Sequence, residues 1–174
     1  MTTPDPISDA QAYQRSLLQA LAGDDPAEVQ ARAADDIRAL VTESGRDLRT
    51  RPARREWSAL LCLAHIADAE LVMAARYRFV LTHDRPDLLG YDQDLWVDGL
   101  HRDDEDPAAL LRTFEPLRAS NIELWRGASE ADRQRVGLHR ERGAESFELM
   151  FRMIAGHDRV HLAQARRAVA AARA

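Results

Sequence analysis

Apolar residues recur at intervals of three and four along most of the chain, which is the spacing of the buried face of a helix. The strongest pattern covers about residues 56–81. A second strong pattern starts near residue 146 and continues almost to the C-terminus. No segment between turn signals shows the apolar and polar alternation of a half-buried strand. The pattern therefore predicts an all-α protein.

Helix start and stop signals divide the chain into five predicted helices. They cover about residues 8–21, 26–45, 56–81, 107–125 and 146 to near the C-terminus. Ser8 and Gln11 have the spacing of a capping box, and Pro26 suits a first helical turn. Pro116 lies inside the fourth range and predicts a kink there. We predict one domain over residues 1–174, a four-helix bundle with an extra N-terminal helix.

Composition and charge narrow the function classes. The chain has 174 residues, of which 45% are hydrophobic and 30% charged, and this suits one domain with a hydrophobic core. Its net charge of −5 disfavours a nucleic-acid partner, because such affinity depends on concentrated positive charge. The absence of lysine excludes Schiff-base chemistry. Without a signal sequence, a long apolar run or a second cysteine, we expect a cytoplasmic protein with no membrane partner.

Three histidines occupy inward positions of the two strongest predicted helices. His157 and His161 are four residues apart, which places both imidazoles on one helix face. That face continues through apolar positions, while arginines recur every seven residues on the opposite face. His65 shares its own face with Leu61, Val72 and Phe79. All three rings are therefore expected to point into the bundle.

This arrangement favours a metal site over three separate core histidines. A lone inward histidine is usually a core residue that hydrogen-bonds a backbone group or a carboxylate. An i,i+4 pair with a third inward histidine favours a shared divalent ion, which relieves the cost of burying several polar nitrogens. Three imidazole ligands leave coordination positions open, as in catalytic sites. A di-iron bundle is excluded because no Glu-x-x-His pair is present, and a zincin because Asp158 replaces the required glutamate.

Side chains one turn from the histidines are candidates to orient them. Asp68 follows His65, and Gln164 follows His161, so each could hydrogen-bond the second ring nitrogen of a ligand. Alternatively, Asp68 pairs with a nearby arginine and Gln164 only fills the helix seam. Cys62 is either a thiolate ligand or a small core residue.

Two long connections, about residues 82–106 and 127–144, are of a length typical of functional segments. In the first, Tyr91, Asp92 and Trp96 could close over the site and contact a substrate, although a buried tryptophan often only anchors a loop.

Charged residues supply further candidates for substrate binding. Arg142 in the second connection and Arg76 on the face of His65 could bind carboxylates of a substrate. His139 and Glu141 beside Arg142 either bind an anion with it or form a solvated charge cluster.

Three stretches resemble the DinB-like (YfiT-like) superfamily of metal-dependent enzymes. They are Trp57-Ser58, the segment HIADAE that begins at His65, and the segment AGHDRVHLAQ that contains His157 and His161. The resemblance covers about residues 40–170 and leaves the role of residues 1–40 open. It implies a four-helix bundle, often a homodimer, whose three histidines bind zinc, nickel or iron. It also implies transferases or isomerases that use a low-molecular-weight thiol such as bacillithiol or mycothiol, although many members have no known activity.

Three interpretations of the function follow. The first is a metal-dependent S-transferase that joins a small thiol to a small electrophilic substrate. The second is a metal-dependent hydrolase of a small ester or amide. The third is a non-catalytic metal-binding stress-response protein, which predicts no cavity beside the ion.

Overall fold

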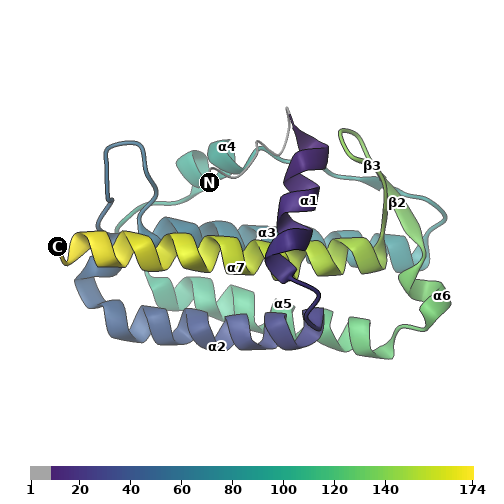
Figure 1. Cartoon of the computed structure of the whole chain (residues 1–174), viewed down its shortest axis with the longest axis horizontal. Helices are drawn as coiled ribbons and strands as arrows, with labels where there is room; N and C mark the ends of the chain where they lie inside the picture. The colour runs from purple at the N-terminus through teal and green to yellow at the C-terminus, as the bar shows by residue number, and fades with distance from the viewer. Residues whose placement is uncertain (1–8) are drawn as a thin grey trace.

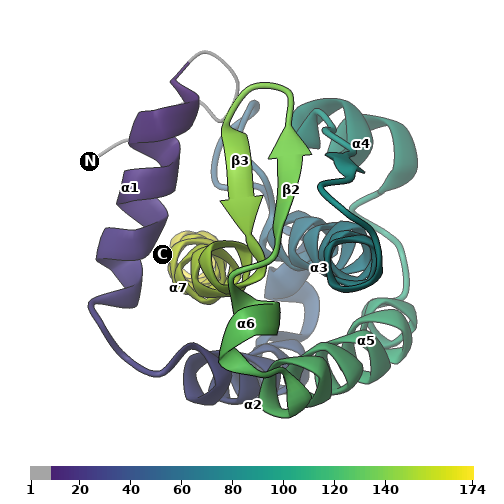
Figure 2. The ribbon, with the colours of Figure 1, turned by 90° about the vertical axis from the view of Figure 1, so that its right-hand side faces the viewer.

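Four long helices form the bundle in the computed structural model, which describes residues 9–174. They are α2 (Pro26–Ser44), α3 (Ala59–Thr82), α5 (Pro107–Gly127) and α7 (Phe147–Ala172). Both α5 and α7 pack against α2 and α3 (Figure 1). Seen end-on, α2 and α3 lie at opposite corners of the bundle (Figure 2). The first and second long helices, α2 and α3, are thus diagonal in space, as are α5 and α7, whereas α3 and α5 are neighbours; the predicted bundle architecture is confirmed.

Local signals set the helix ends. The side chains that cap the four bundle helices accept hydrogen bonds from backbone N–H groups of the first turn, and they are Asp25, Ser58, Asp106 and Ser146. Because Ser58 is the cap, α3 begins three residues later than predicted. A short 3-10 helix, η1 (Gly45–Arg49), follows α2 at a glycine with φ of 51°. Helix α5 continues through Pro116 to Gly127 as one element.

The expectation of no strands was wrong. Strand β1 (Asp87–Leu88) pairs in parallel with β2 (Val136–His139), which pairs in antiparallel with β3 (Gly143–Ser146). The strands have two to four residues, too few for an alternating pattern to stand out. The long connections also hold the short helices α4 (Gln93–Leu100) and α6 (Glu130–Arg133).

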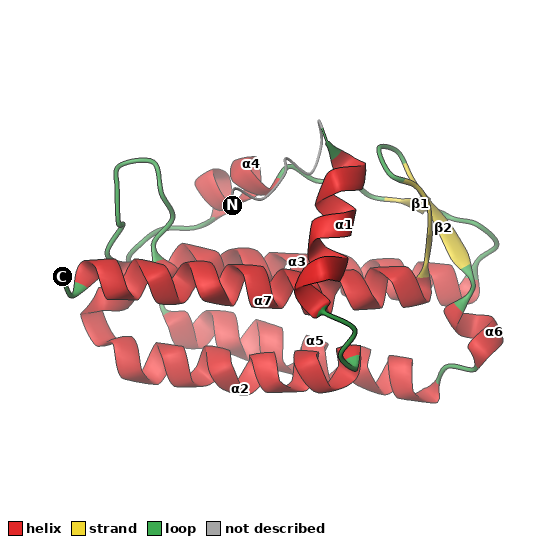
Figure 3. Ribbon diagram, viewed as in Figure 1, coloured by secondary structure: helices red, strands yellow, loops and turns green. Residues whose placement is uncertain are grey.

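The N-terminal helix α1 (Ala10–Leu21) crosses α7 at a steep angle instead of joining the bundle (Figure 1). Asp9 caps it; Ser8, which we expected to do so, lies outside the described residues. Figures 2 and 3 show α1, the sheet and α4 on the same side of the bundle, over the α3 and α7 pair. These additions form a cover over one face of the bundle.

The core lies between the four long helices, but two large apolar residues of α3 are outside it, among them Phe79, which was expected on the inward face with His65. Leu71 is 48% exposed and Phe79 is 51% exposed, whereas Leu61 and Val72 are buried as expected. Helix α3 is apolar on more than one face, so periodicity alone did not separate its inner from its outer positions. No helix within residues 9–174 is long and apolar enough to cross a membrane.

Gly156 allows α1 to contact α7 closely. A Cβ atom at this position would overlap the backbone carbonyl of Leu17 on α1. Backbone atoms cannot move aside as the end of a flexible side chain can, so the contact requires glycine. Because Gly156 directly precedes His157, the cover is anchored beside the histidine cluster.

We expect Gly156→Ala to lower the free energy of unfolding by about 1–3 kcal/mol, because the added methyl group forces α1 away from α7. Urea denaturation measures this change, and limited proteolysis within residues 10–21 reports whether α1 detaches. Gly127→Ala is the matched control, since no atom lies within 4 Å of its added Cβ; we expect it to be neutral or slightly stabilising. Wild-type stability and protease resistance in Gly156→Ala would refute the anchoring role.

Candidate metal centre and its cavity

Three buried histidines meet between α3 and α7. His65 comes from α3, and His157 and His161 come from consecutive turns of α7; they are 1%, 4% and 6% exposed. The Nε2 atoms of His65 and His157 are 2.9 Å apart, and one potential ligand nitrogen from each ring lies within 4.8 Å of the others. The structure thus brings together the three residues that the spacing selected.

Burial keeps these rings neutral. It lowers the pKa of His65 and His157 well below the usual value of 6.5, with the neighbouring histidines adding to the shift. Burial also lowers the pKa of His161 to about 4, against an opposing hydrogen bond with Gln164. Neutral imidazole is the form that binds a metal ion, so the cluster has the correct protonation state at neutral pH.

The surroundings of the rings fit a metal ion. Gln164 Oε1 lies 3.0 Å from His161 Nδ1, so Nδ1–H donates to it and Nε2 keeps a free lone pair. Within the described part of the chain, the Nδ1 atoms of His65 and His157 are buried without a hydrogen-bond partner. The ring of Trp57 lies beside His65 and His161, with centroids 5.2 and 6.3 Å away. Three neutral imidazoles, each able to offer one ring nitrogen to the same point, are a suitable set for a divalent ion.

A buried guanidinium holds the two helices that carry the ligands. Arg118 of α5 donates to both carboxylate oxygens of Asp158, at 2.5 and 3.1 Å, and lies 2.8 Å from Glu70 Oε2. Asn121 donates to the other oxygen of Glu70 at 2.7 Å. Burial opposes the charge of Arg118, but the two carboxylates outweigh it and raise its pKa. Asp158 directly follows His157, so this network sets the rotation of α7 about its axis.

Asp68 contacts a different residue from the one expected. Its Oδ2 lies 2.9 Å from His101 Nε2, and the other ring nitrogen of His101 lies 3.0 Å from Glu105. The structure therefore places Asp68 against His101 rather than His65. Loop 101–106 lies far from α3 in sequence, which is why spacing along one helix could not predict this pairing. The thiol of Cys62 is buried outside the histidine cluster, and burial raises its pKa to about 12.

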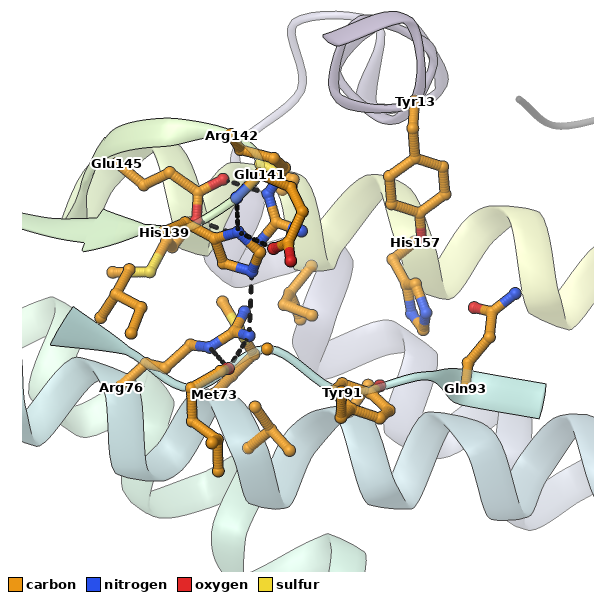
Figure 4. A pocket seen from close by; sticks show the side chains of 18 of the residues that line it. Tyr13, Met73, Arg76, Tyr91, Gln93, His139, Glu141, Arg142, Glu145 and His157 are labelled. Atoms are coloured by element: carbon orange, nitrogen blue, oxygen red, sulfur yellow. Dashed lines mark hydrogen bonds and ion pairs between the residues drawn. The ribbon is translucent and has the colours of Figure 1, made fainter. Parts of the chain in front are cut away.

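A cavity of about 640 Å³ opens from the histidine cluster under the cover. Its lining includes His65 and His157 at one end, and its middle is apolar. Figure 4 shows a group of charged side chains opposite His157, with Tyr13 pointing in from α1. The apolar side chains of the lining are Leu17, Ala69, Val72, Met73, Leu88, Met150, Met153 and Ile154.

Most of the expected substrate-binding residues line this cavity. Arg76, Tyr91, Asp92 and Arg142 are among them. Asp92 also caps α4 by accepting from two backbone N–H groups. Trp96 is not part of the lining; its ring packs on Tyr91, with a centroid distance of 4.6 Å, and so anchors the loop.

Two features of the lining were missed in the sequence. Tyr13 and Leu17 come from α1, whose role had been left open, and Glu145 comes from β3. Apolar residues on α1 predicted a buried face but not the element that the face contacts.

Comparisons with known proteins agree with this geometry. Residues 14–165 match the family described as the DinB superfamily, so the match extends into α1, beyond the expected range of residues 40–170. Among solved structures, the chain is similar to YfiT from Bacillus subtilis, described as "a probable metal-dependent hydrolase with an unusual four-helix bundle topology". The identity is 20%, the TM-score is 0.69, and the match covers 97% of this chain and 91% of that one. A search of curated proteins found no match.

We expect the metal-free protein to become less stable as the pH decreases. Each cluster histidine has a folded-state pKa below its unfolded value near 6.5, so the unfolded chain binds more protons. The free energy of unfolding is therefore highest above pH 6.5 and decreases toward pH 4, by about 1.4 kcal/mol per pH unit for each histidine. Urea midpoints at pH 8 and pH 5 measure the loss. His83→Gln, at an exposed histidine, should keep the same slope, and a flat profile would contradict buried neutral rings.

Loss of the central guanidinium should be costly. We expect Arg118→Met to lower the free energy of unfolding by about 3–5 kcal/mol, because Glu70 and Asp158 are left buried without a counter-charge. Equilibrium urea unfolding measures this effect. Arg112→Met is the control: Arg112 has an exposed ion pair with Asp106, so its loss should cost less than about 1 kcal/mol. Equal effects of the two substitutions would show that the network does not hold the helices.

Proposed function

The chain belongs to the DinB superfamily, and we propose that it is a metal-dependent enzyme acting on a small molecule. The observation that carries the proposal is the position of the buried histidine cluster at one end of a mainly apolar cavity, which His65 and His157 line. A metal with only a structural role needs no adjoining space, so the cavity favours catalysis over a non-catalytic metal-binding protein.

We propose that His65, His157 and His161 hold the ion. When bound, a divalent ion at such a site lowers the pKa of a thiol or a water molecule and stabilises its deprotonated form. The chain contributes the rest of the site. Gln164 orients His161, while Tyr13 and the apolar lining exclude bulk water and position the reactant.

For the reaction, we propose that the enzyme is a low-molecular-weight-thiol S-transferase of the bacillithiol or mycothiol type. In this reaction the thiolate sulfur forms a bond to an electrophilic carbon, the leaving group departs with its electron pair, and the thiol proton passes to solvent. Within residues 9–174, no carboxylate joins the histidine cluster. Thiol transfer does not require a general base once the thiolate has formed, so a site with histidines alone suits it.

Hydrolysis of a small ester or amide is the second candidate. It is supported by the description of YfiT, to which this chain is similar in fold. Three histidines are also the ligand set of some metal sites that activate water. The homodimer and the cytoplasmic location stay predictions.

The test is metal analysis of the purified protein, followed by assays that pair small thiols with electrophiles and, separately, assays with small esters and amides. We expect about one divalent ion per chain and turnover that stops when a chelator removes it. His157→Ala should lose most of the ion, because it removes one of three ligands. His83→Ala is the control and should retain both metal and turnover.

The outcomes separate the candidates. Chelator-sensitive thiol consumption supports the transferase, and chelator-sensitive ester or amide cleavage without thiol supports the hydrolase. Turnover that survives complete metal removal, or full metal content in His157→Ala, would show the proposed centre to be wrong.

A further inference from the structure

The cavity has a second polar end, opposite the histidine cluster. Figure 4 shows its labelled members gathered around the end of α3 and the β2–β3 hairpin. They are Arg76, His139, Glu141, Arg142 and Glu145. The apolar lining lies between this group and His157, so a ligand that fills the cavity presents different chemistry to its two ends.

Arg142 and Glu145 form an ion pair at this end. Arg142 donates to both oxygens of Glu145, at 2.5 and 3.1 Å, and Glu145 is completely buried. Glu141 lies 3.0 Å from His139 Nδ1. Of the other carboxylates in the lining, Asp92 caps α4 and Asp87 is exposed in β1. None of these carboxylates lies within ion-pair distance of Arg76.

Arg76, unlike Arg142, has no carboxylate partner among residues 9–174. It is 6% exposed, and in the described part of the chain no carboxylate lies within ion-pair distance of it. Its guanidinium donates to the carbonyl oxygen of Leu89 and, weakly, to the sulfur of Met73 at 3.6 Å. Burial and then the charge of Arg142 lower its pKa, yet a guanidinium stays protonated in proteins. The cavity wall thus contains a buried positive charge without a contacting counter-ion.

His139 contacts Arg76 but does not balance its positive charge. Burial and the two arginines lower its pKa to about 4, so the ring is neutral at pH 7. The tautomer with its proton on Nδ1 donates to Glu141 and presents the Nε2 lone pair to Arg76 Nη2, 3.3 Å away. His139 therefore orients the guanidinium but supplies no negative charge.

From this asymmetry we infer that the cavity binds a molecule with an apolar body and one terminal carboxylate, which pairs with Arg76 while the opposite end of the molecule lies beside the histidine cluster. A buried cation needs an anionic partner, and a carboxylate matches the guanidinium fork. Arg142, the other candidate from the sequence, is occupied by Glu145. The inference rests on the proposed function in naming the substrate class of the same site.

The test is binding of three eight-carbon probes, octanoate, 1-octanol and octylammonium, to the full chain by calorimetry. The chain is used both with zinc and after chelation, because a carboxylate can also bind a metal ion. Without metal, we expect octanoate to bind at least about tenfold more tightly than octanol, and octylammonium more weakly than either. Equal affinities, or no octanoate binding at millimolar concentration, would overturn the inference.

Substitutions of Arg76 test whether this residue causes the preference for octanoate. Arg76→Met should reduce octanoate affinity about tenfold or more and change octanol affinity less than twofold, since only the charged contact is lost. Arg76→Lys should retain part of the preference, and it serves as the main variant if Arg76→Met does not fold. Arg46→Met, at an exposed arginine outside the cavity, is the control. An unchanged octanoate preference in both Arg76 variants would also overturn the inference.

The same measurements separate this inference from the proposed function. His157→Ala should keep the octanoate preference in the absence of metal, since Arg76 is untouched. If octanoate binds through Arg76 but the protein holds no metal, the proposed enzyme fails and the carboxylate site stands. If metal and turnover are found without any carboxylate preference, only the carboxylate site fails.

Discussion

One buried guanidinium determines how the two helices that carry the three histidines face each other. Arg118 reaches from α5 into the core and contacts Asp158 on α7 and Glu70 on α3. Apolar packing is non-directional and tolerates small rotations of a helix, whereas a hydrogen-bonded ion pair does not. With one carboxylate on each helix bound to the same cation, the rotations of α3 and α7 are coupled. His65 and His157 meet as a consequence.

This arrangement has an energetic cost that the rest of the fold must offset. Two carboxylates, a guanidinium and three imidazoles are withdrawn from water within one small core. The ion pairs balance the charged groups, and the neutral state of the histidines avoids uncompensated charge. What remains is a set of nitrogen donors whose hydrogen bonding is incomplete, and this is the condition in which an ion adds most to stability.

The segments that leave the bundle convert a packed core into a binding site. Helix α1 and the three-stranded sheet cover the α3 and α7 pair (Figure 2), and a cavity remains beneath them. They add Tyr13 and the charged group near Arg76 to the lining, so the cavity has chemically different ends. The bundle itself provides the three histidines, and the cover provides Tyr13 and most of the charged side chains that line the cavity.

Sequence periodicity was sufficient for the four long helices and for the pairing of His157 with His161, because both depend on spacing along a single helix: four residues between these histidines imply one face in any helical protein. The hydrogen bond between Gln164 and His161 has the same local origin. The meeting of His65 with His157 and His161 depended on the packing of α3 against α7. The pairing of Asp68 with His101, the exposure of Phe79 and the contribution of Tyr13 depended instead on which distant segments pack together. The tertiary structure also decided which arginine is paired. The sequence does not distinguish Arg76 from Arg142, and they differ because Glu145 packs against Arg142 alone.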